Sequence, residues 1–89
     1  MGVGGDPGRG MKLSTDQRRA LWLLDEAEPR GCTEAVMRLG HGFKAELLAG
    51  LVHDGLASVA AETITAGRRP IEVARLRITG AGRRALAPR

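Results

Sequence analysis

The stretch that decides the fold covers residues 56–79 and reads LASVAAETITAGRRPIEVARLRIT. Its outer parts, residues 56–65 and 71–79, are rich in β-branched side chains and change the apolar period from 3.6 to 2, which is typical of β-strands. The segment AGRRP at residues 66–70 joins them, and its glycine and proline favour a turn. We therefore predict a β-hairpin that carries Arg68 and Arg69 at its tip.

A first helix is predicted well before this hairpin. Ser14 is a suitable N-cap, and Gln17 stands three residues later, as a capping box requires. Apolar residues then recur at helical spacing as far as Ala27 or Glu28, where a proline and a glycine follow. Trp22 lies partly off the apolar stripe, so we expect it either to cover the flank of the domain or to lie in a dimer interface.

Two further helices are predicted between the first helix and the hairpin. Thr33 caps a short one over residues 34–39, which should turn Val36, Met37 and Leu39 inward. A connection through His41 leads to the next helix, over residues 43–54, and Gly55 supplies its left-handed C′ position. Two helices joined by such a short glycine-containing turn are typical of a helix-turn-helix.

After the hairpin, Thr79 caps a last helix over residues 80–87. The order of three helices, a hairpin and a helix predicts an α+β, mainly α, winged helix: a three-helix helix-turn-helix core, a β-hairpin wing and a short C-terminal helix. We place this single domain at residues 13–87. Residues 1–12 are rich in glycine, which loses much backbone entropy when it becomes ordered, and we interpret them as a disordered tail.

Positive charge gathers toward the C-terminal end. Residues 68–89 contain seven arginines and one acid, a net of +6, whereas residues 1–67 carry seven basic and nine acidic side chains, a net of −2. A positive pole of this kind suits a polyanion that approaches from one side, although an arginine-rich composition without any partner gives the same count.

Residues that would indicate catalysis or metal binding are sparse. Cys32, His41 and His53 lack the spacing of a metal site, and no catalytic constellation is visible, so we expect no enzyme activity, metal, cofactor or small-molecule ligand. Cys32 is interpreted as an inert thiol or, alternatively, as a redox-sensitive one. One cysteine, no apolar run of membrane-spanning length and no signal-peptide pattern favour a cytoplasmic protein.

Two segments resemble the winged helix-turn-helix superfamily. Residues 47–59, LLAGLVHDGLASV, are similar to the end of a recognition helix that enters a first wing strand, and residues 75–87, RLRITGAGRRALA, are similar to the second wing strand with its following helix. The likeness covers residues 13–87 and is strongest to small bacterial transcriptional regulators of the multiple-antibiotic-resistance-regulator or phenolic-acid-regulator kind. Such regulators usually have extra helices for dimerisation or ligand sensing, for which this sequence leaves no room.

The winged helix implies DNA binding through the third helix and the wing. We expect the start of this helix and the arginine tip to share one convex surface toward double-stranded DNA, and with four to six phosphate contacts the logarithm of affinity should fall against log salt with a slope of roughly −4 to −5. The homodimer that two half-sites require would form through the first helix. The predicted DNA-binding residues are His41, Lys44, Glu46, Arg68, Arg69, Arg75 and Arg77.

A second interpretation stays open. The third helix is apolar and poor in charge, which also fits a winged-helix module that binds protein and not DNA. A continuous positive face over that helix and the wing would favour DNA, whereas an apolar groove flanked by isolated charges would favour protein.

Overall fold

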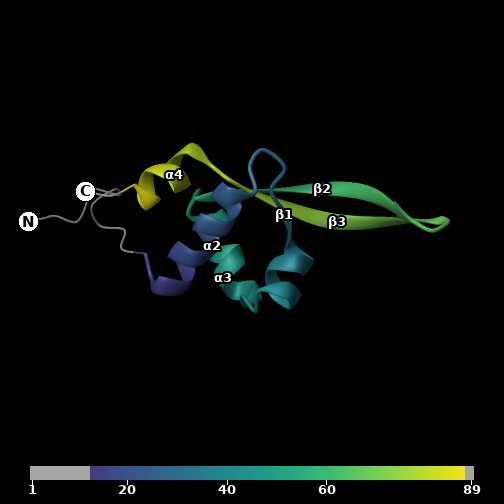
Figure 1. Cartoon of the computed structure of the whole chain (residues 1–89), viewed down its shortest axis with the longest axis horizontal. Helices are drawn as coiled ribbons and strands as arrows, with labels where there is room; N and C mark the ends of the chain where they lie inside the picture. The colour runs from purple at the N-terminus through teal and green to yellow at the C-terminus, as the bar shows by residue number, and fades with distance from the viewer. Residues whose placement is uncertain (1–12, 88–89) are drawn as a thin grey trace, which may run out of the picture.

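The protein has an α+β architecture in which helices gather at one end and a long hairpin leaves the other (Figure 1). The structure, a computed structural model, describes residues 13–87, and the tail predicted for residues 1–12 lies outside the described residues. The three strands form an antiparallel sheet in the order β1-β3-β2. In chain order the elements are α2 (Thr15–Glu26), β1 (Cys32–Thr33), the π-helix η1 (Val36–Gly40), α3 (Ala45–His53), β2 (Ala57–Ala66), β3 (Arg69–Ile78) and α4 (Gly80–Leu86).

The helix α2 forms as its sequence predicts. The Ser14 hydroxyl accepts a hydrogen bond from the Gln17 backbone N–H at 3.1 Å, and the Gln17 side chain accepts one from the Ser14 N–H at 2.8 Å. This capping box satisfies two backbone donors that the first turn would otherwise leave open. Ala20, Leu21 and Leu24 then bury the inner face of the helix.

The second helical segment differs from its prediction. It begins where expected, because the Thr33 hydroxyl accepts from the Val36 N–H at 3.2 Å, but it continues as a π-helix in which the His41 N–H donates to the Val36 carbonyl at 3.2 Å. A turn closed from residue i to i+5 holds more residues than an α-turn, so the side chains no longer follow the 3.6-residue stripe. Only Met37 reaches the core; Val36 and Leu39 are 48% and 80% exposed, and the prediction that they face inward is wrong.

The third helix is shorter than predicted at its start and ends as predicted. It begins at Ala45, with Lys44 as N-cap, so that Phe43 is buried just before the helix. At its end, Gly55 has a positive φ of +77°. The Leu56 N–H donates to the Leu51 carbonyl at 2.9 Å and the Gly55 N–H to the Val52 carbonyl at 3.0 Å, which is a Schellman motif.

The predicted hairpin is present, with a tighter turn. Strands β2 and β3 pair over ten residues, from Ala57 opposite Ile78 to Ala66 opposite Arg69. The turn is therefore the two residues Gly67 and Arg68, and a positive φ at Gly67 alone, +65°, is the pattern of a type II′ turn. The short strand β1 was not predicted; it pairs with β3 at Leu76 and Arg75.

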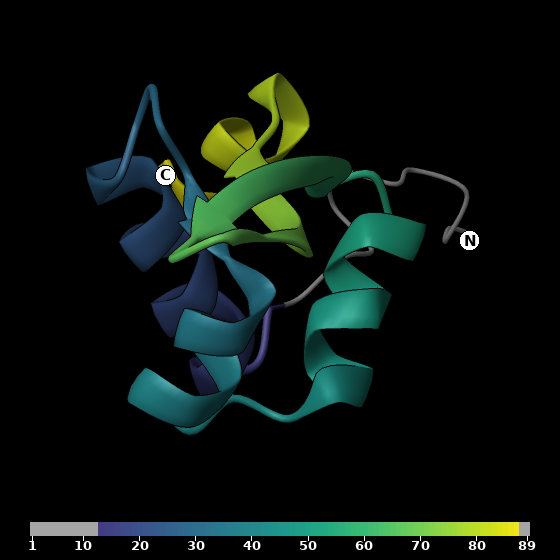
Figure 2. The same ribbon diagram turned by 90° about the vertical axis from the view of Figure 1, so that its right-hand side faces the viewer.

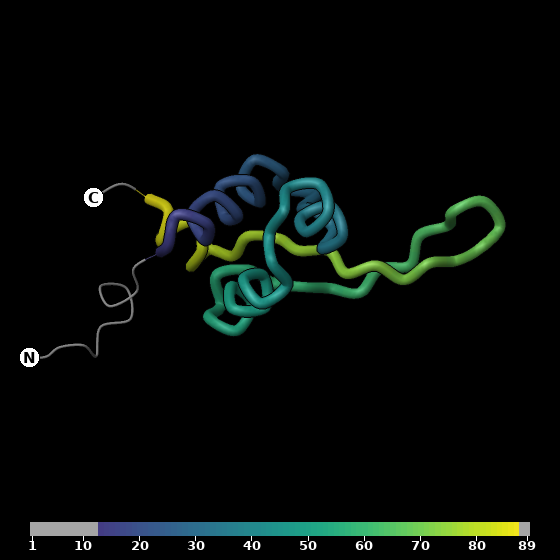
Figure 3. Tube along the Cα trace, turned by 90° about the horizontal axis from the view of Figure 1, so that it is seen from below, coloured from purple at the N-terminus to yellow at the C-terminus, as the bar shows by residue number. Residues whose placement is uncertain are grey.

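Beyond its base, the hairpin stands free of the helices. Ten paired residues carry the tip about 30 Å from the base, and the molecule measures 58 Å along its longest axis against 23 Å across. Every residue of β2 after Ala57 is exposed. Figure 3 shows both strands running far past the helices, and the view from the tip in Figure 2 shows the helices grouped behind the sheet.

The core lies where the helices meet the base of the sheet. Helix α4, capped by the Thr79 hydroxyl, which accepts from the Gly82 N–H at 3.0 Å, closes this core from the C-terminal side. Gly82 is buried there against Leu56. No helix within residues 13–87 is long and apolar enough to cross a membrane. The buried apolar residues are Ala20, Leu21, Leu24, Met37, Phe43, Leu48, Leu51, Leu56, Ala57, Leu76 and Ile78.

Candidate nucleic-acid interface

The tip of the hairpin presents two arginines to solvent. Gly67 makes the tight turn possible because it adopts the left-handed conformation at no steric cost. Arg68 completes the turn and Arg69 begins β3, so both follow directly from the turn geometry. Both are exposed, and among residues 13–87 neither makes an ion pair. The tip is thus a compact group of two available guanidinium groups.

Arg75, in contrast, has a partner on its own hairpin. Its Nε lies 2.5 Å from Oε1 of Glu62, and its side chain is only 25% exposed. The two residues are diagonal neighbours on one face of the sheet, because Glu62 is opposite Val73 and Arg75 is opposite Ala60. The carboxylate therefore neutralises much of the positive charge that the sequence placed on this strand.

Arg77 belongs to a four-residue ion cluster at the base of the hairpin. It donates two hydrogen bonds to Glu28, at 2.8 and 3.2 Å, while Arg83 of α4 reaches the same carboxylate at 3.2 Å and Asp25 at 3.4 Å. The hydrogen bond from Arg77 is the main reason that the pKa of Glu28 lies below its usual value, and the same bond raises the pKa of Arg77. The cluster ties the end of α2, the hairpin base and α4 together.

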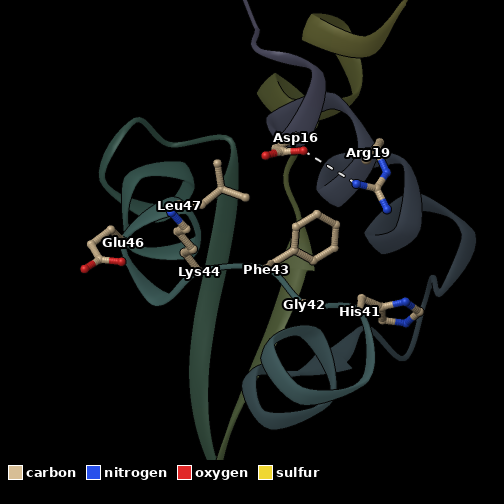
Figure 4. A pocket seen from close by; sticks show the side chains of 8 residues that line it. All are labelled: Asp16, Arg19, His41, Gly42, Phe43, Lys44, Glu46 and Leu47. Carbon is tan, nitrogen blue, oxygen red and sulfur yellow. Dashed lines mark hydrogen bonds and ion pairs between the residues drawn. The ribbon is translucent and has the colours of Figure 1, made fainter.

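The three other predicted residues surround the start of α3. Lys44 is its N-cap and makes no side-chain capping bond, and Glu46 lies in the first turn. With His41 they line a shallow groove of about 420 Å³ between α2 and α3, which also includes Asp16, Arg19, Gly42, Phe43 and Leu47. In Figure 4, Phe43 lies between the two sides of the groove, whereas Glu46 and His41 point away from it on opposite sides.

Charges of both signs form the rim of this groove. Arg19 lies over the Phe43 ring, 5.5 Å from its centroid, and also contacts Asp16 at 3.5 Å. On the α3 side, Lys44 is followed two residues later by Glu46. The groove is therefore an apolar floor with isolated charges around it, and its face is not uniformly positive.

The predicted site residues form two separate groups. Arg68 and Arg69 lie at the far end of the hairpin, while the start of α3 lies in the helical body (Figure 1). Most of the ten-pair hairpin lies between the two groups, and the single convex surface expected of them stays a prediction. Any one ligand that touches both must be long.

Cys32 lies in β1 beside Leu76 and is half-buried. Burial raises the pKa of its thiol, which leaves less thiolate at neutral pH. Within residues 13–87, no three His, Cys, Asp or Glu side chains are grouped so that they could hold a metal ion.

Sequence reasoning missed the acidic partners of the arginines. Asp25, Glu28 and Glu62 look like ordinary surface acids in the sequence, and Glu28 stands 49 residues before Arg77. Only the pair of Glu62 and Arg75 could have been found from the sequence, because the two residues are 13 apart and lie at similar distances on either side of the predicted turn.

Comparisons of the chain with protein-family models, with curated proteins and with solved structures found no match.

Proposed function

We propose that the chain is a winged-helix DNA-binding protein, a transcriptional regulator that contacts duplex DNA through its hairpin wing and the start of α3. The order of elements supports this proposal: β1 lies between the first two helical segments, α3 leads into the hairpin, and the sheet order is β1-β3-β2. In such a fold the third helix enters the major groove and the wing contacts the backbone or an adjacent minor groove.

One observation carries the proposal: within residues 13–87, Arg68 and Arg69 have no ion-pair partner at the hairpin tip, whereas Arg75 and Arg77 have carboxylate partners. A guanidinium group binds phosphate through two parallel hydrogen bonds and is favoured in a narrow minor groove. Because the hairpin holds the tip about 30 Å from its base, the arginines can reach DNA well beyond the footprint of α3.

The start of α3 contributes less. Lys44 can contact a phosphate or a guanine edge, and Glu46 can accept a hydrogen bond from a cytosine amino group. His41 lies beside them at the same end of the helix. With so few polar side chains for base contacts, we expect affinity from phosphates and little discrimination between sequences.

Salt dependence tests this model. With Arg68, Arg69 and Lys44 as the phosphate contacts, log affinity for duplex DNA should fall against log salt with a slope of roughly −2 to −3, since each contact contributes about 0.9. This is shallower than the −4 to −5 expected from the sequence, because Arg75 and Arg77 are ion-paired.

The double variant Arg68→Ala, Arg69→Ala should lose about two units of that slope, measured by fluorescence anisotropy on a labelled duplex. Arg84→Ala is the control, because Arg84 is also exposed but lies on α4, at the other end of the molecule (Figure 1). An equal loss of slope in both variants, or no binding at low salt, would contradict the wing contact.

The groove beside α3 favours one second candidate, a winged-helix module that binds protein. Its floor of Phe43 and Leu47 and its rim of mixed charge suit a protein partner better than a polyanion. Failure of the folded chain to bind DNA at low salt would favour this candidate.

The homodimer predicted through the first helix stays a prediction. Trp22 is 56% exposed on α2 and is therefore available for such a contact. It is nevertheless a single aromatic side chain with charged neighbours one helical turn away, at Arg18, Arg19, Asp25 and Glu26.

A further inference from the structure

Two isoleucines lie opposite each other near the tip of the hairpin and outside the core. Ile64 of β2 pairs with Ile71 of β3, and the side chains of two opposite residues lie on the same face of a sheet. They are 40% and 42% exposed. In the part of the chain that the structure describes, neither belongs to the hydrophobic core or packs against it. This isoleucine pair is therefore an apolar surface on the free part of the hairpin.

The isoleucine pair lies beside the tip arginines. Side chains alternate between the two faces along a strand, so Arg69 and Ile71 share a face. Arg68 lies in the adjoining turn. The nearest acid on this face is Glu62, whose carboxylate is held by Arg75. The tip thus combines apolar side chains with two guanidinium groups that have no ion-pair partner within residues 13–87.

The charge and the size of this tip indicate what it binds. Two adjacent arginines favour a polyanion, which leaves a nucleic acid and an anionic membrane as candidates. Two isoleucine side chains hold fewer carbons than one myristoyl chain, which by itself gives only marginal membrane binding. In a groove of DNA, by contrast, a small apolar side chain suffices, because it can enter between two base pairs, unstack them and bend the duplex.

We propose that the isoleucine pair is a wedge that enters the minor groove, unstacks one base step and bends the duplex, while Arg68 and Arg69 bind the phosphates beside it. This inference rests on the proposed DNA binding and names the class of ligand. The preferred ligand is a duplex that bends easily, with flexible pyrimidine–purine steps. A wedge of this kind bends DNA toward the major groove and so opens the minor groove.

The dimensions of the hairpin agree with an opened groove. The minor groove of straight DNA is about 6 Å wide, whereas the backbones of two paired strands are about 4.8 Å apart before any side chain is counted. The hairpin therefore fits only where the groove is widened. Every residue of β2 after Ala57 is exposed, so no helix of the described residues covers β2 where the duplex would bend around it.

Fluorescence energy transfer between dyes at the two ends of a short duplex measures the bend. The parent protein should raise the transfer on binding, because bending brings the ends closer. The double variant Ile64→Thr, Ile71→Thr keeps two β-branched side chains that favour strands and keeps both tip arginines. It should bind with the salt slope of the parent protein and bend the duplex little. Val59→Thr is the matched control, because Val59 is 49% exposed on the same hairpin but lies near its base.

A mismatched duplex tests the unstacking step at constant phosphate charge. Two adjacent mismatches at the centre of the duplex lower the cost of unstacking without adding a phosphate. We expect the parent protein to bind this duplex about tenfold more tightly than the matched one, since unstacking is part of its binding cost. The Ile64→Thr, Ile71→Thr variant should bind both duplexes equally. Bend and mismatch preference are both measured on the parent protein, so the proposal stays refutable even if that variant fails to fold.

The outcomes separate this inference from the proposed function. A parent protein that binds duplex DNA but neither bends it nor prefers mismatches would overturn the wedge and leave DNA binding intact. Loss of the bend in Val59→Thr to the same extent as in the double variant would also overturn the wedge. No binding to either duplex at low salt would overturn both. Binding to vesicles of phosphatidylglycerol and phosphatidylcholine that requires the isoleucines would then assign the tip to a membrane surface.

Discussion

Replacing Gly82 with alanine measures how closely α4 packs against the base of the hairpin. A Cβ at Gly82 would overlap the Leu56 carbonyl oxygen and lie 3.2 Å from the Leu56 carbonyl carbon and 2.7 Å from Cγ1 of Ile78. The carbonyl cannot rotate away, because its oxygen also accepts the Thr79 N–H at 3.1 Å. Overpacking of this kind costs up to about 3 kcal/mol, and alanine returns about 1 kcal/mol through its helix propensity.

The net loss of stability is therefore about 2 kcal/mol, which lowers the melting temperature by roughly 10 °C in a domain of this size. Gly80→Ala is the matched control in the same helix, because its Cβ would meet only the flexible Arg84 side chain, at 3.5 Å. Thermal unfolding followed by far-UV circular dichroism compares the two variants with the parent protein. Equal melting temperatures for both variants would refute the close contact between α4 and the segment that leads into β2.

Three further predictions concern single residues. The hydrogen bond from Arg77 lowers the pKa of Glu28 below 4.5. The ionised carboxylate therefore stabilises the fold above that pH, and this stabilisation is lost as the pH falls. Below about pH 5, the melting temperature should drop more steeply in the parent protein than in Glu28→Gln. Ser14→Ala removes the capping box and should cost about 1 kcal/mol in urea unfolding, and a change below the error of the fit would show that the cap is not formed. Cys32, whose thiol pKa is raised by burial, should react with a disulfide reagent more slowly in the folded than in the urea-unfolded protein at neutral pH, and equal rates would contradict its burial.

The sequence predicted those elements whose ends carry their own signal. The capping box at Ser14, the cap at Thr79 and the left-handed Gly55 each act through bonds within a few residues, and all three are present in the structure. The hairpin also follows from local pattern, because alternating β-branched residues and a glycine turn suffice to pair its strands.

The remaining features depend on contacts that no local pattern encodes. Strand β1 has two residues and exists only because β3 lies beside it, so it has no period of its own. The π-turn of η1 carries Val36 and Leu39 out of the core although their spacing in the sequence is helical. The length of free hairpin could not be predicted either, because apolar alternation marks a strand without showing whether anything covers it.

The distribution of available charge differs most between the sequence and the structure. The net of +6 over residues 68–89 suggested one broad positive pole, but folding brings Glu62 to Arg75 and brings Glu28 to Arg77 and Arg83. Exposed pairs of this kind add little stability, yet they cancel the field that a distant phosphate would feel. Within the described part of residues 68–89, the arginines whose charge no carboxylate cancels are therefore Arg68 and Arg69 at the hairpin tip and Arg84 on α4, at opposite ends of the molecule (Figure 1).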